Sequence, residues 1–202
     1  MAGLNITLLR HPRVVAEAGT CYGLTDLPAE PEHAAQCVAD WVRALPSGAI
    51  IVSSPLSRCE QQSEQICRQR GDIASKTDVR LLELNFGDWE GRPWGQIGEL
   101  AMAPWMLNFL HRPPGTTVLG EAVIEMLDRV AAAMLESHDR PVVWLTHAGV
   151  IRSACALARG TPIQTAGDWP ADPIGFGSST PLHFNSDVVL ASLANLRGAP
   201  QR

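Results

Sequence analysis

The stretch "ITLLRHPRV", residues Ile6 to Val14, decides the fold and contains the first chemically informative residues of the chain. Its first four residues are apolar and predict a short buried strand. Arg10 and His11 then follow, with no polar residue between them and the strand. A buried strand that runs directly into a guanidinium and an imidazole is expected to end at an open face of a sheet, where other segments can meet these side chains.

The composition is that of an ordinary globular protein. The 202 residues favour one domain, with or without an insertion, and 46% of them are hydrophobic against 18% charged. A net charge of −5 argues against nucleic-acid binding through a basic surface. No window of ~18 apolar residues predicts a membrane span, and the N-terminus lacks the basic start of a signal peptide. We therefore expect a cytoplasmic protein without nucleic-acid or membrane partners; no pattern sets its oligomeric state.

The five cysteines are an odd number and include no Cys-x-x-Cys pair. In a reducing compartment such residues are most often small core residues, so we expect no disulfide framework. The histidines outside the predicted site show no metal-ligand spacing either. We expect neither a metal nor a cofactor.

Short apolar runs alternate with amphipathic segments along the chain. Predicted strands lie at residues 6–9, 49–54, 79–84 and 141–146. Predicted helices lie at residues 31–45, 54–71, 121–136 and 148–160. This alternation predicts an α/β fold with a mostly parallel sheet and helices on both faces. A closing antiparallel pair of strands is predicted at residues 181–184 and 188–193.

Two stretches break this alternation. The Trp- and Gly-rich residues 85–100 predict irregular chain, and the segment after them, to about residue 110, predicts a helix. We expect an insertion or lid around residues 86–118 in an otherwise single domain of residues 1–202. Residues 162–181 hold many Pro and Gly and predict a loop. At the start of the helix at residues 54–71, Ser54 is expected to act as the cap.

Side chains that suit an anion follow three of the predicted strands. Arg10 and His11 end the first strand, Arg58 lies one turn into the helix after the second, and His147 directly precedes the helix after the fourth. In such sheets ligands bind beyond the carboxyl ends of the strands. Two guanidinium groups, two imidazoles and two helix N-termini at this edge predict an anion site, and a phosphate dianion matches them best.

A histidine at the centre of a phosphate site indicates catalysis as well as binding. Imidazole with one unprotonated nitrogen is a good nucleophile, so attack by His11 on phosphorus would give a phosphohistidine. The arginines would spread the charge of the transferring phosphoryl group. The leaving oxygen needs a proton, which Glu83, at the end of the third predicted strand, would supply.

Five motifs carry a resemblance to a known family: "LLRHP", "SSPLSRC", "LLELNFGDWEG", "LGEAVIEMLDRV" and "LTHAGVIR". These motifs follow one another as they do in the histidine phosphatase superfamily, also called the phosphoglycerate-mutase-like family. The chain resembles that family over about residues 5 to 160. The resemblance implies a three-layer α/β/α sandwich that needs no metal. It implies His11 as the phosphorylated nucleophile, Glu83 as the proton donor, and a phosphate pocket of Arg10, Arg58 and His147.

Two loops, "TCYGLTDLP" and "FGDWEGRPW", are similar to those of the α-ribazole phosphatase branch of that family. This finer resemblance implies α-ribazole 5′-phosphate, a precursor in cobalamin assembly, as the substrate. Tyr22 and Gly23 would then contact the substrate, and aromatic rings could stack on its flat base. Three-carbon acids would instead need cationic clamps, of which the sequence outside the pocket offers mainly Arg92 and Arg112.

Three positions depart from the family pattern. Pro12 stands where a glycine is usual and has no N–H to donate, Glu17 stands where many members have asparagine, and Ala122 replaces a serine. A carboxylate in the pocket would repel phosphate. We therefore expect the loop that carries Glu17 to take a different route.

The favoured function is a metal-independent phosphomonoesterase that acts on a small phosphorylated substrate. One alternative is a phosphoglycerate mutase, which must protect its phosphoenzyme from water and rebind the product. The other is a catalytically silent module that only binds a phosphorylated ligand. The intact arginines and histidines argue against the silent module, whereas Pro12 and Glu17 keep it open.

Overall fold

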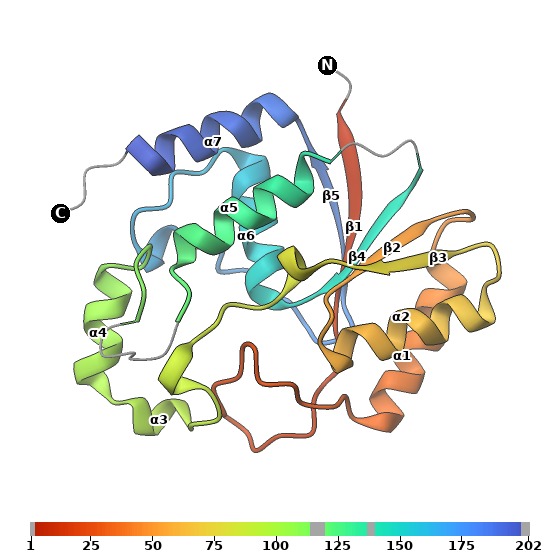
Figure 1. Cartoon of the computed structure of the whole chain (residues 1–202), viewed down its shortest axis with the longest axis horizontal. Helices are drawn as coiled ribbons and strands as arrows, with labels where there is room; N and C mark the ends of the chain where they lie inside the picture. Colours follow the sequence, from red (N-terminus) through yellow and green to blue (C-terminus); the bar gives the residue numbers. More distant parts are fainter. Residues whose placement is uncertain (1–2, 114–119, 137–139, 199–202) are drawn as a thin grey trace.

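The structure is a computed structural model that describes residues 3–113, 120–136 and 140–198. A five-stranded sheet in the order β3–β2–β4–β1–β5 forms its centre (Figure 1). The strands are β1 (Leu4–Arg10), β2 (Ile50–Ser53), β3 (Ala74–Thr77), β4 (Val142–Thr146) and β5 (Ser179–Phe184). The first four strands run parallel to their neighbours, and β5 pairs antiparallel with β1 at one edge.

Helices cover both faces of the sheet, so the fold is the predicted α/β sandwich (Figure 1). One face carries α1 (Pro31–Ala44) and α2 (Ser57–Gln69). The other carries α5 (Val123–Met134), α6 (Ala148–Arg159) and α7 (Ser186–Gly198). No helix in the described ranges combines the length and the apolar character that crossing a membrane requires.

Neighbouring strand residues face opposite layers, which is why apolar side chains follow one another in β1 and β4 where both faces are covered. Leu9 and Leu145 pack with α1 and α2, whereas Leu8 and Trp144 pack with the helices of the opposite face. All four side chains are buried. Two apolar clusters, one on each side of the sheet, therefore hold the strands from which the site residues emerge.

The prediction of a third strand at residues 79–84 is wrong. The third strand is the "ASKT" segment of β3, whose four residues are all exposed and so carried no apolar signal. β3 pairs with the edge of β2, and the apolar run that follows joins no strand of the sheet. It begins with the 3₁₀ helix η1 (Val79–Leu81) and continues as irregular chain, with Leu81 and Leu84 in the core.

Two further expectations need correction. β5 forms as predicted, but residues 188–193 are part of α7 rather than a strand. Val189, Leu193 and Leu196 recur at helical spacing and are buried, which favours a helix over strand pairing. Ser54 does not cap α2, which begins at Ser57 without a side-chain cap.

The segment predicted as an insertion or lid packs through aromatic rings. Trp105 lies edge-on to Phe86 and Trp89, with ring centroids 5.9 and 5.5 Å apart. Trp89 is 4% exposed and Trp105 7%, so both belong to the core. A single domain with a lid stays a prediction, since residues 114–119 lie outside the described residues. The short helices of the segment are η2 (Gly87–Trp89), α3 (Trp94–Ile97) and α4 (Glu99–Leu107).

Candidate active site

The pairing of β1 with β4 brings the two predicted site histidines together. Arg10 lies opposite Thr146 in the parallel register, so His11 and His147 are the next residues of two adjacent strands. The backbone N–H of His11 donates to the carbonyl of Thr146 at 2.9 Å. The two imidazole rings have their centroids 5.1 Å apart.

His11 is held in one tautomer by its own neighbour. Its Nδ1 lies 2.6 Å from the carbonyl oxygen of Pro12, and because a carbonyl only accepts, Nδ1 must carry the proton. Burial, together with the positive charge of Arg58, lowers the pKa of His11 to about 3. The ring is therefore neutral at physiological pH, with its free lone pair on Nε2. Pro12 fixes the His11 tautomer through its carbonyl oxygen. The absence of an N–H in proline does not affect this bond.

Arg58 projects from the first turn of α2 and is completely buried. Its Nη1 and Nη2 donate to the carbonyls of Thr25 and Gly23 at 2.8 and 2.6 Å. Its Nε donates to Nδ1 of His147 at 3.3 Å. Since a guanidinium has five N–H donors, these contacts to described residues use three and leave two for an anion.

His147 stands at the N-cap of α6 and is also completely buried. Burial and the charges around it, including that of Arg58, lower its pKa well below the usual value. The Nδ1 atom accepts from Arg58, so the proton of the neutral ring is on Nε2, which lies 2.8 Å from Oγ of Ser54. The structure thus joins His147 and Arg58 in one buried unit beside His11.

Arg10 is covered by a loop to which the sequence analysis assigned no role. The loop between α6 and β5, which contains η3 (Ala166–Asp168), returns over the end of β1. The ring of Phe176 stacks on the Arg10 guanidinium, 3.7 Å from Cζ to the ring centroid, and its centroid lies 5.5 Å from that of His11. Arg10 also donates to the carbonyl of Ile174. Its buried Nε has no partner among the described residues, so this N–H is a donor that an anion can use.

Glu83 reaches the same place from the irregular chain after η1. Its Oε2 accepts the N–H of Gly149 in the first turn of α6 at 3.0 Å, and its Oε1 accepts the N–H of Leu84 at 3.0 Å. A Cβ at position 149 would lie 2.2 Å from Oε1 of Glu83, so only glycine allows this approach. The negative charge of Glu83 acts on Arg10, where it opposes the lowering of the Arg10 pKa by burial.

The loop that carries Tyr22 and Gly23 is fixed by a carboxylate that the sequence analysis did not assign. Glu90 accepts hydrogen bonds from the hydroxyl of Thr25 and from four backbone N–H groups, those of Gly23, Leu24, Thr25 and Phe86. Burial opposes its charge, but the bond from the Thr25 hydroxyl and the backbone donors outweigh burial and lower the pKa of Glu90. Glu90 lies in the motif "FGDWEGRPW", but the motif by itself does not indicate that this glutamate binds the other loop.

Tyr22 and Gly23 lie beside Arg58 and the segment of Glu83. The Arg58 guanidinium carbon is 5.4 Å from the centroid of the Tyr22 ring, and burial raises the pKa of the Tyr22 phenol. A Cβ at Gly23 would come within 1.7 Å of the Leu84 carbonyl, so this glycine allows the two segments to pack. The contact of Tyr22 and Gly23 with a substrate remains a prediction. Glu17, in contrast, is exposed on the preceding loop.

The arrangement combines a neutral imidazole, two guanidinium groups and a carboxylate around one small volume. Such a set can bind an anionic group, attack it with Nε2 of His11 and exchange a proton through Glu83. Among the described residues, no group of three or more His, Cys, Asp or Glu side chains is placed to hold a metal ion. The five cysteines are all free thiols.

The sheet and the polar pocket at its carboxyl edge define an α/β protein with an anion site, and comparison with known sequences gives its family. A model of the "Histidine phosphatase superfamily (branch 1)" matches residues 6–190. The chain therefore belongs to the histidine phosphatase superfamily, and it is a phosphatase.

The curated relatives are phosphatases, and a solved structure shares the fold. The chain is 28% identical over 182 residues to the glucosyl-3-phosphoglycerate phosphatase of Mycolicibacterium vanbaalenii, covering 82% of this chain and 77% of the relative. It is 30% identical over 139 residues to that of Mycobacterium tuberculosis, covering 60% of this chain and 58% of the relative. The structure of a mycobacterial glucosyl-3-phosphoglycerate phosphatase has the same fold, with a TM-score of 0.72 at 22% identity and coverage of 90% and 91%. These relatives do not support the finer resemblance to α-ribazole phosphatases.

The buried histidines predict how stability depends on pH. Folding keeps His11 neutral down to about pH 3, whereas an unfolded chain protonates histidine near pH 6.5. Unfolding therefore takes up a proton between these values, and the free energy of unfolding falls as the pH falls from about 6.5 towards 3. Above pH 6.5 this contribution is complete and constant.

Replacing His11 by glutamine should make this dependence shallower. Urea unfolding of wild type and His11→Gln at a series of pH values between 4 and 8 measures the difference. His33→Gln, which changes a half-buried histidine on α1, is the matched control and should keep the wild-type slope. Identical slopes for His11→Gln and wild type would contradict the buried, neutral state.

Arg58→Lys should lose much of the phosphatase activity although it keeps the charge. An ammonium cannot reach two loop carbonyls and His147 while presenting two further donors to an anion. The loss of one charge-assisted hydrogen bond costs about 1.5–3 kcal/mol, or ~10–100-fold in kcat/KM. Arg68→Lys changes an exposed arginine on the same helix and should leave kcat/KM unchanged. Equal activity of the two variants would show that Arg58 does not bind the reacting group.

Proposed function

We propose that the protein is a metal-independent phosphomonoesterase that passes the phosphoryl group of its substrate through Nε2 of His11 to water. The observation that carries this proposal is the 2.6 Å hydrogen bond from Nδ1 of His11 to the Pro12 carbonyl. It fixes the proton on Nδ1 and leaves the Nε2 lone pair free, while burial keeps the ring neutral. A histidine nucleophile needs both conditions.

The proposed reaction has two steps. In the first, Nε2 of His11 forms a bond to phosphorus while the bond to the leaving oxygen breaks, and Glu83 gives that oxygen a proton. In the second, water attacks the phosphohistidine and gives a proton to Glu83, and the nitrogen–phosphorus bond breaks to release inorganic phosphate. Arg10 and Arg58 bind the phosphoryl oxygens in both steps, and His147 orients Arg58.

For the substrate, we propose a phosphorylated acid, with glucosyl-3-phosphoglycerate as the first candidate because the relatives named above act on it. Two observations favour an acid over α-ribazole 5′-phosphate. Trp89 and Trp105 are buried in the core and are not available for stacking on a base. Arg152, on α6 one turn beyond the site, is close enough for its charge to lower the Arg10 pKa, so a further cation lies beside the phosphate pocket and suits a carboxylate.

The covalent step is tested by trapping the intermediate. Wild-type protein mixed with substrate and quenched rapidly in alkali should carry an acid-labile phosphate on the peptide that contains His11. His11→Ala should carry no phosphate and lose all measurable turnover, while its circular dichroism stays that of the wild type. Substantial turnover by folded His11→Ala would refute the phosphohistidine mechanism.

A substrate panel tests the leaving group. We expect kcat/KM for glucosyl-3-phosphoglycerate to exceed that for α-ribazole 5′-phosphate, and Arg152→Met to lower only the value for the acid. The loss of one charge-assisted hydrogen bond predicts ~10–100-fold. Product analysis with 3-phosphoglycerate separates phosphatase from mutase, since only a mutase returns a phosphoglycerate. A preference for the nucleotide would overturn the assignment of an acid substrate.

A further inference from the structure

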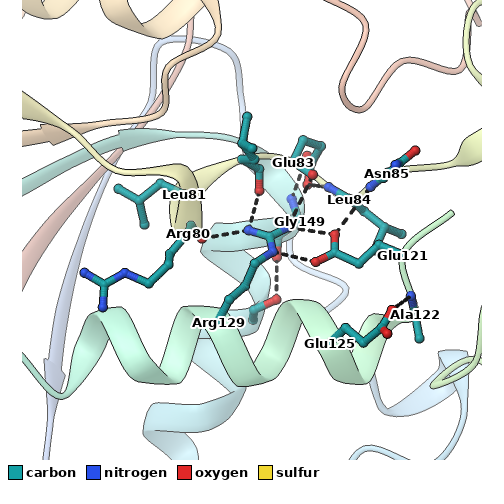
Figure 2. Close-up of polar contacts among 12 residues, drawn as sticks. Arg80, Leu81, Glu83, Leu84, Asn85, Glu121, Ala122, Glu125, Arg129 and Gly149 are labelled. Atoms are coloured by element: carbon teal, nitrogen blue, oxygen red, sulfur yellow. Dashed lines mark hydrogen bonds and ion pairs between the residues drawn. The ribbon is translucent and has the colours of Figure 1, made fainter. Parts of the chain in front are cut away.

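The backbone that carries Glu83 has no sheet to hold it. Residues 80–83 run from η1 into irregular chain and pair with no strand, so their carbonyls need donors from elsewhere. The Thr146 hydroxyl donates to the Leu81 carbonyl at 2.8 Å. The other three carbonyls of this run, those of Arg80, Leu82 and Glu83, accept from a single side chain, that of Arg129 on α5 (Figure 2).

Arg129 acts as the centre of a clamp around this segment. Its Nη1 donates to the carbonyls of Arg80 and Leu82 at 2.7 and 2.6 Å, and its Nη2 to that of Glu83 at 3.3 Å. The other edge of the guanidinium is bound by both carboxylate oxygens of Glu121, at 2.5 and 2.8 Å. The two side chains are 19% and 17% exposed, so water competes little for these bonds.

Glu121 extends the clamp to the far side of Glu83. Its backbone N–H donates to the Asn85 carbonyl at 2.8 Å, and one of its carboxylate oxygens accepts the Asn85 N–H at 3.4 Å (Figure 2). The pair formed by Arg129 and Glu121 therefore holds the chain both before and after residue 83. The carboxylate of Glu83 is meanwhile held at its tip by Gly149.

We propose that the ion pair of Arg129 and Glu121 is the positioning device for the Glu83 carboxylate, an inference that rests on the proposed role of Glu83 as proton donor. A proton donor must stay within hydrogen-bond reach of the leaving oxygen, and a misplacement of ~1 Å can cost on the order of 100-fold in rate. Neither side chain touches the reacting atoms. Both act by fixing the irregular backbone that a strand would otherwise have fixed.

A neighbouring arginine supplies the matched control. Arg80 belongs to the same segment and binds Asp78 and Glu136 through its guanidinium, at 2.6 and 2.7 Å. Figure 2 shows its side chain pointing away from Arg129. Arg80→Met therefore removes two ion pairs from the same stretch of chain without removing a donor to the carbonyls that the clamp binds.

The experiment compares leaving groups. An alkyl phosphate has a poor leaving group that needs the proton, whereas p-nitrophenyl phosphate releases a stable phenolate that needs it little. Because kcat/KM reports the steps up to the phosphoenzyme, it isolates the donation of the proton from the later attack of water. In Arg129→Met and Glu121→Gln we expect kcat/KM for the alkyl ester to fall on the order of 100-fold, with a much smaller change for p-nitrophenyl phosphate.

Glu83→Gln sets the reference. It should show the same dependence on the leaving group, and the double variant Arg129→Met/Glu83→Gln should lose no more than Glu83→Gln alone, since both changes remove one function. Arg80→Met should lower kcat/KM equally for the two esters or not at all. Thermal unfolding is recorded for every variant, and Glu121→Gln, the milder change, decides the outcome if Arg129→Met does not fold.

Two different results would overturn the inference for different reasons. If Glu83→Gln affects both esters alike, Glu83 is not the proton donor, and its part in the proposed function fails together with the clamp's role. If Glu83→Gln discriminates between the esters but folded Glu121→Gln does not, the proposed function stands and the ion pair is only structural.

Discussion

The parallel register of β1 and β4 sets Arg10 opposite Thr146, and the geometry of the site depends on this pairing. His11 and His147 leave adjacent strand ends, and a hydrogen bond from the His11 N–H to the Thr146 carbonyl continues the ladder one residue further. A shift of one residue would turn each side chain to the opposite face. The buried alternation of Leu8 and Leu9 on the two faces prevents such a shift, so core packing fixes the position of the nucleophile.

Two other parts of the site lack this support and depend on side chains. The segment of Glu83 has its carbonyls bound by Arg129 and Thr146, and the loop of Tyr22 has its N–H groups bound by Glu90. In each case a half-buried charged group replaces the missing strand partner. Charge-assisted bonds are suited to this task, because each ionised group binds several backbone groups at once. The cost is that such irregular segments depend on residues distant in the sequence.

That dependence separates what the sequence could predict from what it could not. The convergence of His11, Arg58 and His147 was predictable, because each follows a buried strand, at its end or in the next helix, and parallel strands share one carboxyl edge. β3 gives no sequence signal because an exposed edge strand needs no apolar residues, whereas the apolar run after it has the pattern of a strand without forming one. Phe176 lies in none of the quoted motifs, and Arg129 lies in "LGEAVIEMLDRV", a motif that by itself indicates no role for it. The roles of both residues arise only when chain segments far apart in sequence come together.

The central claim is that the fold delivers His11 as a neutral imidazole with its proton on Nδ1 and its lone pair on Nε2. The most direct measurement is the ¹⁵N chemical shift of the two His11 ring nitrogens, followed by NMR between pH 4 and pH 8. The account predicts a protonated Nδ1 and an unprotonated Nε2 at every pH in this range, with no titration. A ring that becomes an imidazolium near pH 6, or a proton found on Nε2 of the neutral ring, would contradict it.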